Sequence, residues 1–278
     1  MFLLPFGLIF TTFTLIPAVY GLWISLHDWD YLLPGKPFVG LDNYRALFDS
    51  ASPVFDFFWQ SMEATGIFTV ASVPLLIVAP MGVALLLNRA FPGRTLFRAV
   101  YFAPYVLGVA VIGLIWRFLL DPNLGMVNAL LGTEIPWTTG LPWAWISLVG
   151  VTVWWTLGFN AVIYLAGLQD IPRDLYDAAR VDGAGRWAEF RHVTIPGLRP
   201  VLTFVVINTI LASANMFGQS YLITQGAPGV ETRTAIMYIA DEGLRSYRMG
   251  SAAAMSYLLT IGLLIVSMLV FRLFREKD

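Results

Sequence analysis

Five polar or aromatic side chains lie within long apolar stretches of the sequence and could bind a polar solute. They are Asn160, Asn208, Asn215, Gln219 and Tyr221. Amide groups offer both a donor and an acceptor to hydroxyl groups, and aromatic faces pack against the apolar faces of sugar rings. Asn215 and Gln219 are four residues apart and would share one face of a helix. The same amides could instead form hydrogen bonds between neighbouring helices, so the pattern leaves both roles open.

The sequence lacks the groups on which most enzymes and ion-coupled carriers depend. It has no cysteine and only two histidines, so we expect neither a thiol nucleophile nor a metal site. No Gly-x4-Gly-Lys-Ser/Thr loop is present, so we expect no catalytic residue and no ATP hydrolysis by this chain. An ion-coupled secondary transporter of a polar solute is the alternative, but such carriers need ionisable groups within the membrane, and only Arg117 lies inside an expected span.

The composition places the chain in a lipid bilayer. Its 278 residues are 58% hydrophobic and 13% charged, and the mean hydropathy is +0.71. A hydrocarbon core about 30 Å thick requires roughly 20 apolar residues per helix. Six stretches are long enough: residues 2–26, 64–87, 99–120, 143–168, 201–223 and 251–271. We therefore predict an all-α polytopic membrane protein with six transmembrane helices, a single domain over residues 1–278 whose core helices lie at about 60–275.

The flanking charges predict the orientation of these spans. Eleven Lys or Arg residues lie in the second loop, the fourth loop and the C-terminal tail, whereas six lie on the opposite side when Arg117 is included. Because positively charged loops are retained in the cytoplasm, both termini are expected to be cytoplasmic. A cleaved signal peptide is the alternative for residues 2–26, but this apolar stretch is too long and has no charged segment ahead of it.

Two further groups of residues are expected at the membrane boundary or in water. Aromatic residues near span ends favour the membrane interface; they are Tyr101, Tyr105, Trp116, Trp143, Trp145, Trp154 and Trp155. Dispersed carboxylates favour a solvated first outer loop; they are Asp28, Asp30, Asp42, Asp49, Asp56 and Glu63.

The loop of residues 169–200 has the pattern of two short helices separated by a turn. Pro172 suits the first helical position, Asp174 favours the positive end of a helix dipole, and Gly183 or Gly185 offers a stop. Apolar residues recur at helical spacing; they are Leu175, Ala178, Ala179, Val181, Trp187 and Phe190. The helix pair would present this face to another protein, which could then approach closely, or would fold back and pack it against the chain's own helices.

The same loop resembles a family signature. Asp177-Ala178-Ala179, three residues, Gly183, nine residues and Val193-Thr194-Ile195-Pro196 have the spacing of Glu-Ala-Ala, x3, Gly, x9, Ile-x-Leu-Pro. That pattern marks the permease subunits of binding-protein-dependent ABC importers. The chain resembles most closely the carbohydrate branch, which includes permeases for oligosaccharides and for glycerol-3-phosphate. Further matches in the same order are residues 38–44, 166–169 and 224–228.

The resemblance implies a role for the loop and a set of partners. Residues 169–200 would be a coupling helix-turn-helix that binds a cytoplasmic ATP-binding subunit, through Tyr176, Asp177, Ala178, Ala179, Asp182, Gly183, Trp187 and Pro196. The implied partners are a second, similar permease subunit, two copies of the ATP-binding subunit, which would hold ATP and Mg, and an extracytoplasmic substrate-binding protein, with no nucleic acid. The implied function is translocation of a sugar or similar small polar solute across the bacterial plasma membrane by alternating access.

Overall fold

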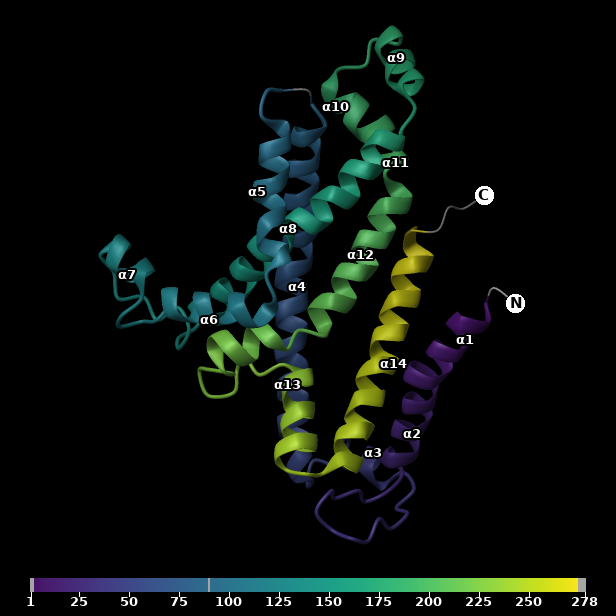
Figure 1. Cartoon of the computed structure of the whole chain (residues 1–278), viewed down its shortest axis with the longest axis vertical. Coiled ribbons are helices and arrows are strands. Elements are labelled where there is room, and N and C mark those ends of the chain that lie inside the picture. Colours follow the sequence, from purple (N-terminus) through teal and green to yellow (C-terminus); the bar gives the residue numbers. More distant parts are fainter. Residues whose placement is uncertain (1–2, 90, 275–278) are drawn as a thin grey trace. The chain divides into compact units, whose positions relative to one another are not determined.

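The computed structural model describes residues 3–89 and 91–274, and every regular element in this part of the chain is a helix (Figure 1). The described residues form two compact units. The first contains those before Thr65 together with Arg233–Leu264, and the second contains Thr65–Thr232 and those after Leu264. The expected all-helical class is confirmed.

Four helical stretches are long and apolar enough to cross a membrane. They are Leu4–Ser25, which comprises α1 (Leu4–Phe10), η1 (Thr11–Leu15) and α2 (Ile16–Ser25), and the helices α4 (Pro53–Asn88), α8 (Trp143–Asp170) and α14 (Met249–Phe274). These stretches confirm helices at the first, second, fourth and sixth expected spans.

Helix α4 begins well before the apolar stretch that predicted it. It starts at Pro53 and has 36 residues, which corresponds to a length of about 54 Å, more than a bilayer core requires. Asp56 and Glu63 therefore belong to this helix and not to a loop as predicted, although both are exposed as expected. Proline is tolerated in the first turn of a helix, so Pro53 was a possible helix start, but hydropathy alone did not reveal it.

The third expected span is broken rather than continuous. Helix α5 (Arg94–Val106) and helix α6 (Val109–Leu119) meet at an angle of 94°. Pro104 removes one backbone donor from the last turn of α5, and the backbone of Leu107 and Gly108 is extended. The bend follows from this interruption.

The fifth expected span is also interrupted. Helix α12 (Arg199–Ala214) ends in the middle of the predicted stretch, and a π-helical turn, η3 (Ser220–Thr224), follows five residues later. At its other end α12 meets Arg186–Gly197 at 69°. The described residues thus hold four candidate spans, or up to six if each bent pair is one span.

Shorter helices connect these elements. They are α3 (Asp42–Ala46), α7 (Met126–Leu131), α9 (Arg173–Val181), α10 (Arg186–Glu189), η2 (Phe190–Thr194), α11 (Ile195–Gly197), α13 (Ala235–Ala240) and η4 (Asp241–Arg245). Within the second unit, α9 and α10 lie at the same end as the turn between α4 and α5 (Figure 1).

The first unit contains a buried carboxylate outside the long helices. The hydrophobic core of the first unit is formed by Leu47, Val54, Phe58, Tyr238, Ala254 and Met255. Glu242 of η4 is 2% exposed, and its Oε2 accepts a hydrogen bond of 2.8 Å from Nη2 of Arg248, which is half-exposed. Burial raises the pKa of Glu242, while the Arg248 guanidinium acts in the opposite direction.

In the second unit, helices α5 and α8 approach each other closely at a glycine. A Cβ atom at Gly158 would lie 2.2 Å from the carbonyl oxygen of Tyr101 and 2.6 Å from the Cα of Phe102. Only a residue without a side chain allows this approach. The contact brings the last turns of α5 onto the middle of α8.

Candidate functional site

A cavity of about 250 Å³ lies within the second unit. Four helices contribute to its wall, namely α4, α5, α8 and α12, and so does the segment that follows α12. The lining residues are Phe68, Leu76, Tyr105, Thr152, Trp155, Thr156, Phe159, Asn160, Asn208, Thr209, Ala212, Ser213, Met216 and Gln219. Both interrupted spans therefore border the cavity close to their breaks.

One side of the cavity is aromatic. The rings of Tyr105 and Phe159 are stacked, with centroids 4.6 Å apart and planes inclined by 17°. Trp155 donates from its indole Nε1 to the carbonyl oxygen of Leu107, at 3.1 Å. This bond uses a carbonyl at the break between α5 and α6 and fixes the indole beside the stacked pair.

Two polar groups of the cavity connect helices to one another. Asn160 donates from Nδ2 to the carbonyl oxygen of Leu76, at 3.1 Å, and lies 3.5 Å from Oγ1 of Thr209. Ser72 donates to Oγ of Ser213, at 3.1 Å. Asn160 and Ser213 thus line the cavity and also hold α4, α8 and α12 together, so Asn160 forms the interhelical bonds considered from the sequence.

Two amides remain available to a ligand. Asn208 on α12 and Gln219 after it both line the cavity, and neither side chain has a hydrogen-bond partner among residues 3–89 and 91–274. An amide offers two donor hydrogens and one acceptor oxygen. Together with the stacked rings, these groups could bind hydroxyl groups on one side and an apolar ring face on the other.

The structure separates the other two sequence candidates from the cavity. Asn215 is exposed and donates within its own helix to the carbonyl oxygen of Leu211, at 2.8 Å. The ring of Tyr221 stacks on that of Phe217, with centroids 5.1 Å apart, and does not line the cavity. Because α12 ends at Ala214, Asn215 and Gln219 do not share a helix face as predicted.

Several cavity residues were missed or assigned another role from the sequence. Tyr105 and Trp155 were expected at the membrane interface, and the structure places both in the cavity wall. Thr152, Thr156 and Phe159 were not singled out. Their spacing of four and three residues places them on one face of α8, and this pattern of polar and aromatic residues was a signal that could have identified them.

The loop after α8 forms the expected helix-turn-helix. Helix α9 begins at Arg173, with Pro172 in the capping position rather than the first helical one, and ends at Val181. Gly183 has a φ of +80°, a left-handed conformation that favours glycine, and helix α10 begins at Arg186. The turn between the two helices thus depends on Gly183.

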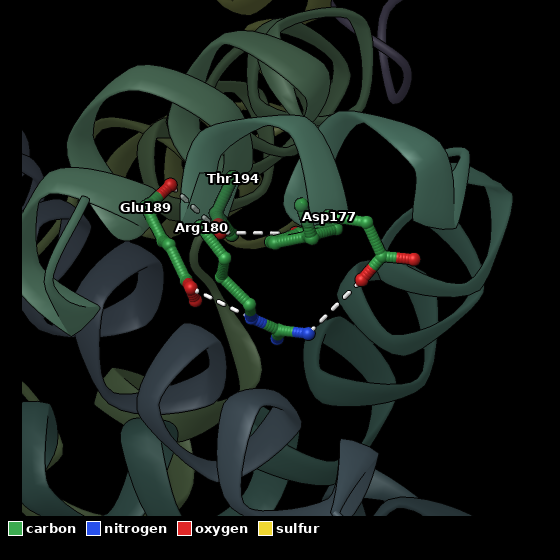
Figure 2. A network of polar contacts seen from close by, with 5 residues as sticks. Asp177, Arg180, Glu189 and Thr194 are labelled. Atoms are coloured by element: carbon green, nitrogen blue, oxygen red, sulfur yellow. Dashed lines mark hydrogen bonds and ion pairs between the residues drawn. The ribbon is translucent and has the colours of Figure 1, made fainter. Parts of the chain in front are cut away.

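A polar network holds the two helices together (Figure 2). Arg180 donates from Nη1 to Oδ1 of Asp177, at 3.1 Å, and from Nε to Oε1 of Glu189, at 2.9 Å. The hydroxyl of Tyr176 lies 3.0 Å from Oγ1 of Thr194. One arginine therefore joins α9 to α10, and one tyrosine joins α9 to η2.

The same helices present an uncovered apolar surface within this chain. Val181 is 86% exposed and Trp187 is 72% exposed, with its ring 5.5 Å from that of Phe190. Ala178 is exposed and Ala179 is half-buried. Four further residues of the predicted coupling set are exposed in this chain: Asp177, Asp182, Gly183 and Pro196.

Among the described residues, no group of three or more His, Cys, Asp or Glu side chains could hold a metal ion.

A family model for the binding-protein-dependent transport system inner membrane component matches residues 64–277. The chain belongs to this family. It is therefore a permease subunit of an ABC importer, an inner-membrane multi-pass protein and not itself an enzyme, as the signature spacing around Gly183 predicted.

Curated relatives of the permease extend over nearly its full length. It is 35% identical to the probable ABC transporter permease protein y4oQ of Sinorhizobium fredii, over 94% of this chain and 84% of that protein. It is 32% identical to the trehalose/maltose transport system permease protein MalF of Thermococcus litoralis, over 99% of this chain and 94% of that protein.

A solved structure shares the fold of the permease. A chain of the bacterial alginate ABC transporter, in complex with an alginate pentasaccharide-bound periplasmic protein, matches with a TM-score of 0.81 at 21% identity. The match covers 99% of this chain and 92% of that chain. At this identity, the likeness concerns the fold.

Proposed function

We propose that this permease translocates a sugar or similar polyhydroxylated solute, and that the solute passes through the cavity of the second unit. The observation that carries the proposal is the stacked Tyr105 and Phe159 pair beside the unpaired amides of Asn208 and Gln219. Rings suit the apolar face of a sugar, and amides suit its hydroxyl groups. No charged side chain lines the cavity among residues 3–89 and 91–274, which favours an uncharged solute over an anion such as glycerol-3-phosphate.

The names of relatives support this class of solute. MalF of Thermococcus litoralis is a trehalose/maltose permease, and a relative from Bacillus subtilis, 32% identical, is named as the arabinooligosaccharides transport system permease protein AraP. The alginate transporter also imports a saccharide. The substrates named for these proteins are all rich in hydroxyl groups, but they differ in the sugar and in its charge.

The proposed assembly follows from the family. The permease pairs with a second permease subunit and with two ATP-binding subunits, which hold ATP and Mg, and it receives the solute from an external binding protein. The family description names dependence on a binding protein, and the alginate transporter structure includes a periplasmic one. No cofactor is assigned to this chain itself.

We assign the coupling role to α9 and α10. Their exposed surface and small residues fit close contact with another protein, and the bonds of Arg180 and Tyr176 make the pair rigid enough to transmit a displacement. With both chain ends in the cytoplasm, as the charges predict, α9 lies on the side of the ATP-binding subunits. Closure of those subunits then drives alternating access in a single domain with six spans.

The test is uptake of radiolabelled sugar into proteoliposomes that contain the complete transporter. We expect uptake to require lumenal ATP and the external binding protein. Replacing Ala178 with Asp and Ala179 with Arg should abolish uptake, whereas Ala51→Arg, a change at an exposed alanine of the first unit, should leave it intact. Uptake driven by a proton or sodium gradient without ATP would instead establish an ion-coupled carrier.

A further inference from the structure

An apolar groove lies between the last turns of α4 and the first turns of α5. It has a volume of about 370 Å³ and is lined by Val83, Leu86, Leu87, Phe91, Phe97 and Tyr101, with Arg89 as the charged residue among its described lining residues. The rings of Phe91 and Phe97 meet edge to face, with centroids 5.7 Å apart. The groove has the chemistry of a site for a hydrocarbon chain, and a cation lies at its end.

A basic cleft adjoins this groove. The cleft has a volume of about 840 Å³ and includes Arg94, Arg173 and Arg180 among its lining residues. A hollow between them is lined by Arg89, which also lines the groove, and by Arg180, which also lines the cleft. The cleft and the groove are therefore neighbouring parts of the surface at the ends of α4, α5 and α8.

The positive charge of this surface is not neutralised within the chain. The acidic residues that line the cleft and the hollow are Asp177 and Glu189, and both are paired with Arg180. Arg89 and Arg94 have no acidic partner among the described residues. A guanidinium group binds phosphate oxygens well because its donors form a planar fork.

The position of the surface matches the membrane boundary. Helix α4 ends at Asn88, α5 begins at Arg94 and α8 ends at Asp170, so these three helices all leave the apolar region here. With the membrane boundary placed at these helix ends, we expect the groove to reach the hydrocarbon and Arg89 and Arg94 to reach the phosphate groups of lipids.

We propose that this surface binds one anionic glycerophospholipid, with an acyl chain in the groove and the headgroup phosphate at Arg89 and Arg94. The absence of a free carboxylate in the described part of the cleft disfavours a headgroup that carries an ammonium group. With the proposed orientation, the lipid belongs to the cytoplasmic leaflet and lies beside the coupling helices α9 and α10.

Native mass spectrometry of the detergent-purified transporter complex tests this proposal. Phosphatidylglycerol and phosphatidylcholine with identical acyl chains are added in turn, and the fraction of complex that retains lipid is measured. We expect the wild type to retain phosphatidylglycerol preferentially. Each arginine near the lipid surface contributes about fivefold in affinity, so Arg89→Gln should lower phosphatidylglycerol binding about fivefold, and the double variant with Arg94→Gln should lose the preference.

Two further variants separate the parts of the site. Leu86→Trp should fill the groove and lower retention of both lipids equally, because it removes space for the acyl chain. Arg45→Gln is the matched control, since Arg45 is an exposed arginine of the first unit that pairs with Asp42. Its lipid retention should equal that of the wild type.

Three outcomes would overturn the proposal. Equal retention of the two lipids by the wild type would exclude an anionic lipid site without recourse to any variant. Displacement of phosphatidylglycerol by an equal concentration of glycerol phosphate would show a site for a soluble phosphate. Release of the ATP-binding subunits from the double variant, with lipid still bound, would show that the arginines contact those subunits instead.

Discussion

The ring of Tyr105, three residues before the extended backbone at Gly108, lies flat against the ring of Phe159 on α8, with centroids 4.6 Å apart. The pair connects the end of one broken span to the middle of a continuous one. Both rings border the cavity, so any solute that occupies it meets an aromatic surface that is already assembled.

Removal of either ring should weaken solute binding more than it weakens assembly. An aromatic contact contributes about 0.5–1.5 kcal/mol, so Tyr105→Ala or Phe159→Ala should raise the apparent KM for uptake by about two- to tenfold. The measurement is the sugar dependence of uptake at saturating ATP. Phe10→Ala removes a ring from a stacked pair on α1, remote from the cavity in sequence, and should leave KM unchanged. An unchanged KM in both cavity variants would exclude these rings from the solute path.

Two glycines of α8 should respond in opposite ways to the same substitution. A Cβ at Gly158 would lie 2.2 Å from a backbone oxygen of α5, whereas a Cβ at Gly150 meets nothing within 4 Å. Gly158→Ala should therefore destabilise the permease by about 1–3 kcal/mol. Gly150→Ala should be neutral or stabilise by up to about 1 kcal/mol, because alanine favours the helix. Thermal unfolding in detergent compares them, and equal midpoints would contradict the close approach of α5 and α8.

Arg180 should matter more for coupling than for stability. The Arg180 side chain is 59% exposed in both of its pairs, and its partners Asp177 and Glu189 are 68% and 16% exposed, so Arg180→Gln should cost about 1 kcal/mol of stability. The same change frees α10 from α9, so the stimulation of ATP hydrolysis by the loaded binding protein should decrease. Arg45→Gln breaks an exposed pair elsewhere and is the control for this measurement. Full stimulation in the Arg180 variant would show that the bridge is dispensable for transmission.

The buried Glu242 should make stability depend on pH. Its pKa in the folded chain is raised above the ordinary value of 4.5 by burial, so the folded state holds its proton at pH values where the unfolded chain has released it. Stability should therefore fall as the pH increases above 4.5, through the window up to the raised pKa. Thermal unfolding between pH 4 and 8 measures this effect.

The matched variant for this pH dependence is Glu242→Gln, which has no proton to lose. Its unfolding midpoint should fall less steeply over the same window. Arg248→Gln should show a larger fall that extends to higher pH than in the wild type, because loss of the guanidinium that favours the carboxylate raises the pKa of Glu242 further. Parallel curves for all three proteins would show that Glu242 does not titrate in this range.

Hydropathy predicted the helices that are continuous and missed the breaks. The stretches near Leu4–Ser25 and Trp143–Asp170 were located to within two residues at each end, because a long apolar helix has a strong signal. Average hydropathy does not change where Pro104 and Gly108 interrupt a span, since the flanking residues remain apolar. Those two residue types together, close to the middle of a stretch, were the available signal.

Prediction of the functional site likewise succeeded where the sequence pattern is local and failed where a helix is interrupted. Helices α9 and α10 and the turn at Gly183 were located from local sequence spacing, which does not depend on how the helices pack. The cavity was predicted in part: Asn160, Asn208 and Gln219 line it, but the face that Gln219 was expected to share with Asn215 does not exist once α12 ends at Ala214. Stacking between α5 and α8 joins residues more than 50 positions apart, and one sequence alone does not reveal it.

The breaks in two spans have a consequence for how specificity in this permease can be altered. Where α5 and α12 are interrupted, main-chain carbonyl and amide groups leave the helical pattern beside the cavity, and one of them already accepts a bond from Trp155. Such groups cannot be replaced by codon changes. A library that varies only side chains would therefore change the aromatic and side-chain amide surface of the cavity but not the main-chain groups beside it. The contribution of those main-chain groups to solute binding could be measured only by chemical replacement of backbone amides with esters.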